Sequence, residues 1–322
     1  MILTGDIGGT RTRLALLHQA ADGWEVVAEE RCASTEHEGL EPLLEQFLSR
    51  YAGSTPRAAA FGVAGPVRDG RCRATNLPWS LSVASLHRAS GVPAFLLNDL
   101  EALAWGIAAL PGEAFATLQA GHPDPQGNRA VIAAGTGLGQ AGLPFCDGDW
   151  RPFACEGGHT DFAPRPGRDT ALLAALTARF GHVSQERVVS GPGLVRLYRH
   201  LLETAGAPLP DWLHDEAAAA RISHHALSGT DSFCQQTLEW FVELYGREAG
   251  NLALKLNASG GLYLGGGIAP KILPALQTGV FLEAFLDKGR MRGLLERVPV
   301  RVILDEQAAL KGLAAFAAAR VR

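Results

Sequence analysis

The stretch that decides the fold is Asp6-Ile7-Gly8-Gly9-Thr10, which joins an apolar start at Ile2 to the apolar run Leu14-Ala15-Leu16-Leu17. Two strands joined by a carboxylate, two glycines and a hydroxyl predict a hairpin whose tip approaches a phosphate. Glycine permits this approach because it has no side chain and can turn its N–H groups inward at positive φ. Asp6 is placed to hold Mg²⁺ through water, as in phosphoryl-transfer sites. The alternative is an ordinary hairpin, since Gly-Gly is also a common turn.

A second glycine-rich turn favours the phosphate interpretation. Gly135-Thr136-Gly137-Leu138-Gly139 follows the segment 129–134, whose apolar residues predict a buried strand. A third cluster, Gly265-Gly266-Gly267, follows the strand-like Leu262-Tyr263-Leu264 and precedes a helix that we expect to begin at Pro270. Three such turns predict one nucleotide held between two related lobes, and the repeated order of strand, glycine turn and strand indicates an internal duplication.

Length and composition indicate a globular chain of about two domains. The chain has 322 residues, of which 47% are hydrophobic, so it is long and apolar enough to bury a substantial core. A formal net charge of −4 gives no electrostatic reason to expect nucleic acid or an anionic membrane as a partner. No lysine follows a glycine turn, which excludes a P-loop.

The cysteines and the first residues predict the compartment. The 5 cysteines are widely spaced and form no C-x-x-C pair, so neither a disulfide framework nor a zinc site is expected. The chain shows no basic segment followed by an apolar one at its start, and no uncharged run approaches about 18 residues. We therefore expect a protein of the reducing cytoplasm, without a membrane partner.

Asn98 and Asp99 end the strand-like segment 94–97. In open α/β sheets, ligands bind beyond the carboxyl ends of strands, where Asp6, Gly65 and the pair Asn98-Asp99 are expected to emerge. A carboxylate at this place suits a general base that takes the proton of a substrate hydroxyl attacking phosphorus. Asp99 equally suits the N-cap of a helix expected from Glu101 to Leu110. The two roles are compatible.

Glu156-Gly157-Gly158-His159 lies in a stretch without helical or strand pattern. Glu-x-x-His on a helix can bind a metal, but the two glycines disfavour a helix and no companion motif is present. As a loop, the segment offers a carboxylate and an imidazole for hydrogen bonds with adjacent hydroxyls of a polyol. A surface loop without a role is the alternative.

Together these segments resemble the bacterial glucokinases, within the wider superfamily of actin, hexokinase and the heat-shock-protein ATPases. The Asp6 turn alone indicates only the superfamily, whereas the segments 156–164 and 181–187 are specific to the glucokinase type. The zinc-binding cysteine cluster of the related repressor-type sugar kinases is missing after His159, which favours the branch without zinc. The matching segments, in order, are Asp6 to Thr10, Leu96-Leu97-Asn98-Asp99, Gly135 to Gly139, Glu156 to Pro164 and Ser190-Gly191-Pro192-Gly193-Leu194.

The resemblance implies an α/β fold of the two-lobed, actin-like ATPase (ribonuclease H-like) type, with mixed sheets, covering helices and a cleft between the lobes. It implies a small α/β domain at residues 1–110, joined by the C-terminal helix 305–322, and a large α/β domain at residues 111–304. It also implies a homodimer.

The resemblance further implies ATP-dependent phosphorylation of D-glucose at O6, with ATP and Mg²⁺ as cofactors. Asp99 is then the general base, and Asp6 lies by Mg²⁺ through water. The residues implied to bind the sugar are Asn98, Asp99, Glu156, His159 and Glu186. The residues implied to bind the nucleotide are Asp6, Gly8, Gly9, Thr10, Gly135, Thr136, Gly137, Gly265, Gly266 and Gly267.

Arg11 departs from the family pattern, which usually has Asn at this position; the arginine either alters phosphate contacts or forms a local ion pair. The residues also fit a kinase of another hexose, such as mannose or fructose, or of N-acetylmannosamine. An actin-like ATPase without sugar kinase activity shares the Asp6 turn, but it gives no reason for Glu156, His159 and Glu186 to gather. A sugar-responsive regulator needs an N-terminal helix-turn-helix, for which a first strand at Ile2 leaves no room. ATP, ADP and polyphosphate remain open as donors.

Overall fold

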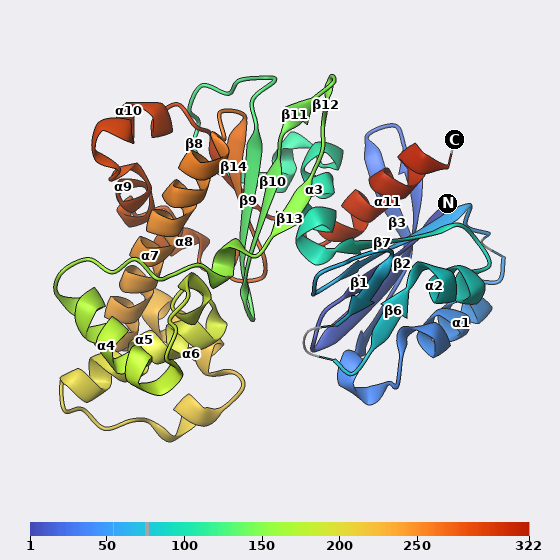
Figure 1. Cartoon of the computed structure of the whole chain (residues 1–322). Coiled ribbons are helices and arrows are strands. Elements are labelled where there is room, and N and C mark those ends of the chain that lie inside the picture. Colours follow the sequence, from blue (N-terminus) through green and yellow to red (C-terminus); the bar gives the residue numbers. More distant parts are fainter. Residues whose placement is uncertain (54, 75–76, 322) are drawn as a thin grey trace. The chain divides into compact units, whose positions relative to one another are not determined.

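The computed structural model describes residues 1–53, 55–74 and 77–321 (Figure 1). The chain divides into two compact units. Unit 1 comprises Met1–Phe115, Pro152–Ala154 and Asp305–Arg322, and unit 2 comprises Ala116–Arg151 and Cys155–Leu304. Residue 322, the last of the segment expected to form the C-terminal helix, lies outside the described residues. Each unit is a mixed sheet covered by helices, as predicted.

Unit 1 is built on a five-stranded sheet with the strand order β3-β2-β1-β4-β7. β1 pairs antiparallel with β2 and parallel with β4, which in turn pairs parallel with β7. The carboxyl ends of these three parallel strands therefore lie at one edge of the sheet. The strands of unit 1 are β1 (Ile2–Ile7), β2 (Arg11–Ala20), β3 (Gly23–Ala33), β4 (Ala58–Val63), β7 (Ala94–Asn98) and the small pair β5 (Arg71–Arg73) and β6 (Ser80–Ser82).

Helices cover both faces of this sheet, because neighbouring strand residues point to opposite sides. Leu3 packs into a core with α1 and α2, whereas Ile2 packs into a second core with α3 and α11 (Figure 1). α3 and α11 approach closely at Gly106, where a Cβ atom would lie 2.3 Å from the Ala308 carbonyl oxygen. The helices of unit 1 are η1 (Ser34–Glu36), α1 (Leu40–Arg50), α2 (Val83–Ser90), α3 (Asp99–Ala109), η2 (Gly112–Ala114) and α11 (Ala308–Arg320).

Unit 2 is built on a six-stranded sheet with the order β13-β10-β9-β14-β15-β8. β9 pairs antiparallel with β10 and parallel with β14, and β14 pairs parallel with β15. The first five strands repeat the order of unit 1, which agrees with the expected duplication. The strands of this sheet and of a small hairpin are β8 (Phe115–Gln119), β9 (Arg129–Ala134), β10 (Leu138–Leu143), β13 (Phe153–Cys155), β14 (Gly261–Gly265), β15 (Val300–Ile303) and the hairpin β11 (Phe145–Cys146) and β12 (Asp149–Trp150). The division into units assigns Phe115 of β8 and most of β13 to unit 1.

The long helix α7 lies among the other helices of unit 2 (Figure 1). Its side chains Trp240, Phe241 and Tyr245 are fully buried in the core of that unit. Asp231 caps its first turn and Asn257 ends it in a left-handed conformation with φ of 48°. The helices of unit 2 are η3 (Gly157–His159), α4 (Arg168–Phe180), η4 (Gln185–Arg187), α5 (Gly191–Thr204), η5 (Asp211–His214), α6 (Ala218–Ser228), α7 (Ser232–Leu256), α8 (Leu273–Leu276), α9 (Val280–Leu286), η6 (Gly289–Met291) and α10 (Arg292–Leu295).

One expected helix start is wrong. The helix expected from Pro270 begins at Leu273 because the preceding turn is held by the β9 end, where the Ala134 carbonyl accepts the Ile268 N–H. Two further elements have no clear signal in the sequence. They are β8, where the Gln119 amide donates to the carbonyls of Leu295 and Val298, and the 3₁₀ turn η4. No helix in the described part of the chain is both long and apolar enough to cross a membrane.

Candidate functional site

The first glycine turn, residues 8–10, closes the hairpin of β1 and β2 after the pair Ile7 and Thr12. The Gly8 N–H donates to the Arg11 carbonyl at 3.0 Å. Ser34, at the start of η1, braces the turn from outside: its hydroxyl donates to the Gly8 carbonyl at 2.8 Å, and its N–H donates to the Thr10 carbonyl at 3.0 Å. The Thr12 hydroxyl lies 2.9 Å from that of Ser34. The brace of this turn is therefore uncharged.

Asp6 lies opposite Arg13 in the hairpin, one residue before the end of β1. Burial raises the pKa of the Asp6 carboxyl, and the Arg13 charge opposes this only in part, since Arg13 also forms an ion pair with Glu29 at 2.9 Å. No group of three or more possible metal ligands occurs among residues 1–53, 55–74 and 77–321. A single carboxylate fits Mg²⁺ held through water, because Mg²⁺ keeps several waters and takes one or two carboxylates beside substrate phosphates.

Arg11, the departure from the family pattern, is exposed at the start of β2. Arg11 forms no ion pair within the described part of the chain. The arginine of β2 that does form one is Arg13, which pairs with Glu29. Of the two alternatives for Arg11, the local ion pair is not formed in this structure.

Asn98 and Asp99 lie where β7 passes into α3. Asn98 is the N-cap: its carboxamide oxygen accepts the Leu100 N–H at 2.9 Å, and its amide donates to the Gly65 carbonyl at 3.1 Å. Asp99 is the first residue of the helix, which therefore begins two residues earlier than expected. The N-cap is Asn98, whose backbone is extended, and not Asp99. An Asp99 oxygen also accepts the Leu100 N–H, at 3.0 Å. The parallel strands of unit 1 thus bring Asp6, Gly65, Asn98 and Asp99 to one edge.

The second glycine turn, residues 135–137, closes the hairpin of β9 and β10 in unit 2. The Gly135 N–H donates to the Gly137 carbonyl at 2.9 Å, and the Gly135 carbonyl accepts the Gly191 N–H at the start of α5 at 2.8 Å. Glu186 braces this turn: its carboxylate accepts the Leu138 N–H at 3.0 Å. A Cβ atom on Gly137 would lie 2.5 Å from the same carboxylate oxygen. The brace here is charged, and Thr136 is exposed at the tip.

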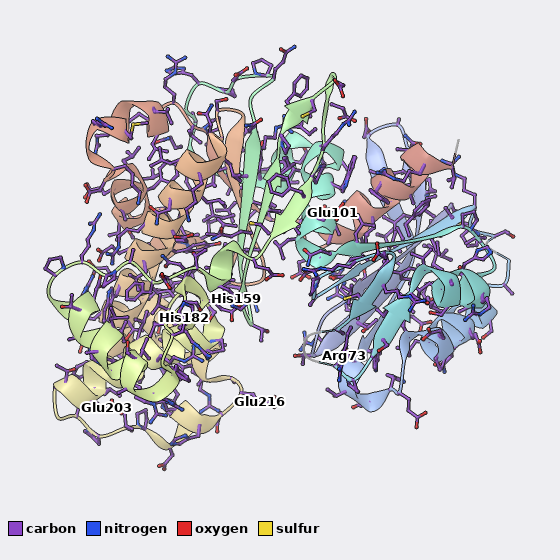
Figure 2. All side chains as sticks on the ribbon, in the orientation of Figure 1. Arg73, Glu101, His159, His182, Glu203 and Glu216 are labelled. Atoms are coloured by element: carbon purple, nitrogen blue, oxygen red, sulfur yellow. The ribbon has the colours of Figure 1, made fainter. Side chains whose placement is uncertain are left out.

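Glu156 and His159 lie on a segment that runs beside the one carrying Glu186. The Gln185 N–H donates to the Thr160 carbonyl, and the Phe162 N–H donates to the Val183 carbonyl, both at 2.9 Å. Glu156 and His159 are exposed and lie 3.8 Å apart. Figure 2 labels His159 on this segment and His182 on its neighbour. Unit 2 therefore brings together the segments of Glu156, His159 and Glu186.

The expected loop at 156–159 is a 3₁₀ turn, η3. Its glycines were expected to disfavour a helix, and in the structure they permit close packing on β10. A Cβ atom on Gly158 would lie 1.9 Å from the Leu138 carbonyl oxygen, and one on Gly157 would lie 2.0 Å from the Gln140 carboxamide oxygen. The sequence pattern does not show this contact because it joins residues of two elements.

A series of hydrogen-bonded side chains lies next to η3, and the sequence patterns did not predict it. The Gln140 amide donates to the buried Glu248 carboxylate at 2.8 Å, which also accepts the Asn251 amide at 3.0 Å. Asn251 in turn accepts the Lys288 ammonium at 2.6 Å. Burial lowers the pKa of Lys288 to about 8, although the Glu248 charge opposes the change. These hydrogen bonds hold the Gln140 side chain, against which Gly157 packs.

A pocket of about 830 Å³ opens in unit 2 beside the second turn, within the size range of small-molecule sites. Gly267 of the third glycine cluster lines it. Gly266 has φ of 78° and a Cβ atom there would lie 2.5 Å from the Ala134 carbonyl oxygen, so only glycine fits. The sequence did not reveal the basic lining side chains, which are Arg179, Arg196, Arg199, His224 and Lys271.

The predicted site residues therefore form two groups. Unit 1 brings together Asp6, the turn 8–10 and Asn98-Asp99 at one sheet edge. Unit 2 brings the turn 135–137 together with Glu186 and with Gly265 to Gly267. Turns rich in glycine beside a pocket can hold phosphates, and carboxylates beside an imidazole can bind hydroxyls.

Comparison with known proteins supports this interpretation. The family model described as glucokinase matches residues 3–320. The chain belongs to the glucokinase family. The glucokinase of Nostoc punctiforme is 41% identical, with 100% of this chain and 99% of the relative aligned. That of Yersinia pestis is 37% identical, with 98% of this chain and 95% of the relative aligned.

Solved structures agree with the family assignment. The glucokinase from an Antarctic psychrotroph is 34% identical and superposes with a TM-score of 0.85, covering 99% of this chain and 98% of that one. A ROK family glucokinase from Streptomyces griseus, solved in complex with glucose and AMPPNP, has a TM-score of 0.67 at 20% identity over 98% of this chain and 99% of that one, and shows the fold alone. The predicted glucokinase resemblance and the actin-like ATPase fold are thus confirmed.

Proposed function

We propose that this chain transfers a phosphoryl group from ATP to O6 of D-glucose, with Asp99 as the general base. The observation that carries the proposal is the match, over the whole chain, to relatives named glucokinase. Structures with this fold have been solved with glucose, and with glucose and AMPPNP. The carboxyl end of β7 gives Asp99 the place at which α/β sheets bind their ligands.

In unit 1, Asp99 accepts the O6 proton, and Asn98, held by Gly65 and the start of α3, fixes the orientation of the sugar. Orientation contributes more than proton abstraction, because the loose transition state of phosphoryl transfer needs little nucleophilic push. Asp6 holds Mg²⁺ through water, and the cation supplies charge neutralisation at the phosphates. Gly8, Gly9 and Thr10 form the turn that meets the same phosphates, to which the N–H groups of Gly9 and Thr10 and the Thr10 hydroxyl are offered, while the Gly8 N–H closes the turn on Arg11.

In unit 2, Glu156, His159 and Glu186 bind sugar hydroxyls, since the two carboxylates accept hydrogen bonds and the imidazole can donate one. Gly135, Thr136 and Gly137 take phosphate, and Gly265 to Gly267 lie by the nucleoside, with Gly267 lining the 830 Å³ pocket. We further propose the domain limits 1–110 with 305–322, and 111–304, in a cytoplasmic homodimer. Light scattering of the purified chain tests the dimer.

Replacement of Asp99 by Asn tests the general base. We expect turnover with glucose and Mg·ATP to fall by about 10² to 10⁴-fold, the contribution typical of a general base, while the KM for glucose changes much less. Glu45→Gln is the matched control, because Glu45 is exposed on α1 of the same unit and loses the same charge. Unchanged turnover in Asp99→Asn, or equal losses in both variants, would contradict the role.

A further inference from the structure

The pocket of unit 2 has a basic wall that the glycine turns do not explain. Arg179 on α4 and Arg196 and Arg199 on α5 line the same pocket as Gly135 and Thr136. We call these three residues the arginine wall. None of them forms an ion pair within residues 1–53, 55–74 and 77–321; the one hydrogen bond is from Arg196 to the Arg187 carbonyl, at 3.0 Å.

The positive charges are crowded by the fold. The guanidinium carbons of Arg187, Arg179 and Arg196 lie 4.2, 5.1 and 5.3 Å from the centre of the Phe180 ring. Burial, followed by the charges of Arg187 and Arg179, lowers the pKa of Arg196, and only Glu186 opposes this. Like charges held together without carboxylate partners destabilise the free protein, and an anion removes that repulsion.

The carboxylates that face the pocket do not neutralise the wall. Asp215 already pairs with Arg221 at 3.2 Å. Glu216 is exposed and forms no ion pair in the described part of the chain (Figure 2). Arg199 and Glu203 lie four residues apart on α5, but they form no ion pair. The basic residue comes first, which is the order that stabilises a helix less. Lys271 and His224 add further basic groups to the lining.

The wall is continuous with the turn that is proposed to hold phosphate. The Gly191 N–H at the start of α5 donates to the Gly135 carbonyl. Arg196 and Arg199 follow Gly191 by roughly 8 and 12 Å along the helix axis, and helical side chains lean towards the N-terminus. Their guanidiniums therefore extend the turn's positive field along α5, over a length that needs more than one phosphate group.

We propose that Arg179, Arg196 and Arg199 form an anion subsite that holds phosphate groups of the phosphoryl donor beyond the Gly135 to Gly137 turn. The proposal rests on the proposed function, because it takes the donor to carry several phosphates. The shared chemistry is a chain of phosphates, from either a nucleoside triphosphate or an inorganic polyphosphate. The arginines supply charge that no P-loop lysine provides in this chain.

Calorimetric titration of the full chain with tripolyphosphate and, separately, with Mg·ATP tests the subsite. Arg196→Gln and Arg199→Gln should each weaken binding about tenfold, the effect of one charged hydrogen bond, and should reduce its salt dependence. Arg292→Gln is the matched control: Arg292 loses the same charge on α10, pairs with Glu296 and does not line the pocket. Thermal melting confirms that the variants fold.

Weakening for both ligands assigns the subsite to phosphates in either form, weakening for tripolyphosphate alone assigns it to an inorganic chain, and weakening for Mg·ATP alone assigns it to the nucleotide. Unchanged binding of both ligands by both variants, or equal weakening by Arg292→Gln, overturns the proposal. Glucose-dependent ADP release, measured in parallel, separates the two proposals. If wild type phosphorylates glucose while the variants bind as wild type does, the subsite fails and the function stands. If the variants lose binding but wild type transfers nothing to glucose, the subsite stands and the proposed function fails.

Discussion

The two glycine turns close equivalent hairpins, yet they are braced differently. Both follow a first strand that pairs antiparallel with the next strand and parallel with a later one. The turn at 8–10 is held by the hydroxyl and N–H of Ser34, which is uncharged and fully buried. The turn at 135–137 is held by the carboxylate of Glu186, a residue proposed to bind sugar.

From this difference we expect sugar binding to affect the conformation of the second turn and not that of the first. A ligand that draws the Glu186 carboxylate away from the Leu138 N–H, or holds it there, changes the support of Gly137 directly. Ser34 is not among the residues proposed to bind sugar, so we expect the first turn to keep its shape whether or not sugar is bound. The proposed phosphate site of unit 2 is therefore linked to sugar binding by one side chain, and the four predictions below test this contrast.

The largest effect is expected from Gly137→Ala. The new methyl group occupies the space of the Glu186 oxygen, 2.5 Å away, and displaces the brace. We expect kcat/KM for glucose to fall about 10²-fold, as small misplacements of positioning groups do. Gly293→Ala on α10 of the same unit is the control, because nothing lies within 4 Å of its Cβ position. Equal losses in the two variants would contradict the brace.

Glu186→Gln should have the next largest effect. It keeps the shape of the side chain but replaces a charged acceptor of the Leu138 N–H by a neutral one, so we expect about a tenfold loss in kcat/KM. Steady-state kinetics should show KM rising for glucose and for ATP together. Glu203→Gln, an exposed change of the same charge on α5 (Figure 2), is the control. A rise confined to glucose would separate the turn from the sugar.

Ser34→Ala should affect ATP alone. The Gly8 carbonyl and the Thr12 hydroxyl lose their partner in a buried setting, which costs about 1–3 kcal/mol of stability. We expect the KM for ATP to rise while the KM for glucose stays constant, which initial-rate measurements at varied ATP and glucose will show. Ser49→Ala on α1, where the hydroxyl is exposed, is the control. A matching rise for glucose would remove the contrast between the turns.

The smallest effect concerns Glu29, which holds Arg13 in the strand that leaves the first turn. Burial opposes the change, but hydrogen bonds from Arg31, Gln307 and Arg13 lower the pKa of Glu29 below its usual 4.5. The carboxylate therefore stabilises the fold above pH 4.5, and this stabilisation is lost as the pH falls through the lowered pKa.

Glu29→Gln should accordingly lower stability at pH 7 by about 1 kcal/mol, or roughly 2–4 °C in Tm. The gap to wild type should narrow only below pH 4.5, as Glu29 of wild type becomes protonated. Glu25→Gln, on the same strand with an exposed side chain, should change Tm little. A gap that is constant down to acidic pH would contradict the assignment to charge.

Elements set by local patterns were predictable from the sequence. The strand at 129–134 has the bounds that we expected, because an apolar run and a glycine turn are signals that act over a few residues. The parallel pairing of β1, β4 and β7 agrees with the expectation that Asp6, Gly65 and Asn98-Asp99 emerge at the carboxyl ends of strands. The candidate residues of the two turns come from the same local signals.

Contacts between distant segments could not be predicted in this way. Gln140 and Glu248 are 108 residues apart, and the arginine wall exists only because α4 and α5 line one pocket. The 3₁₀ turn at η3 depends on how closely Gly158 meets β10. Each of these features is decided by packing between elements, which spacing along the chain does not encode.

The most direct test of the account is ADP release with Mg·ATP in the presence and absence of glucose, with mannose, fructose and glucosamine for comparison. We expect strong release with glucose and little without sugar, because turnover requires a hydroxyl at Asp99. Release at the same rate without sugar would contradict the sugar kinase account and indicate an actin-like ATPase instead.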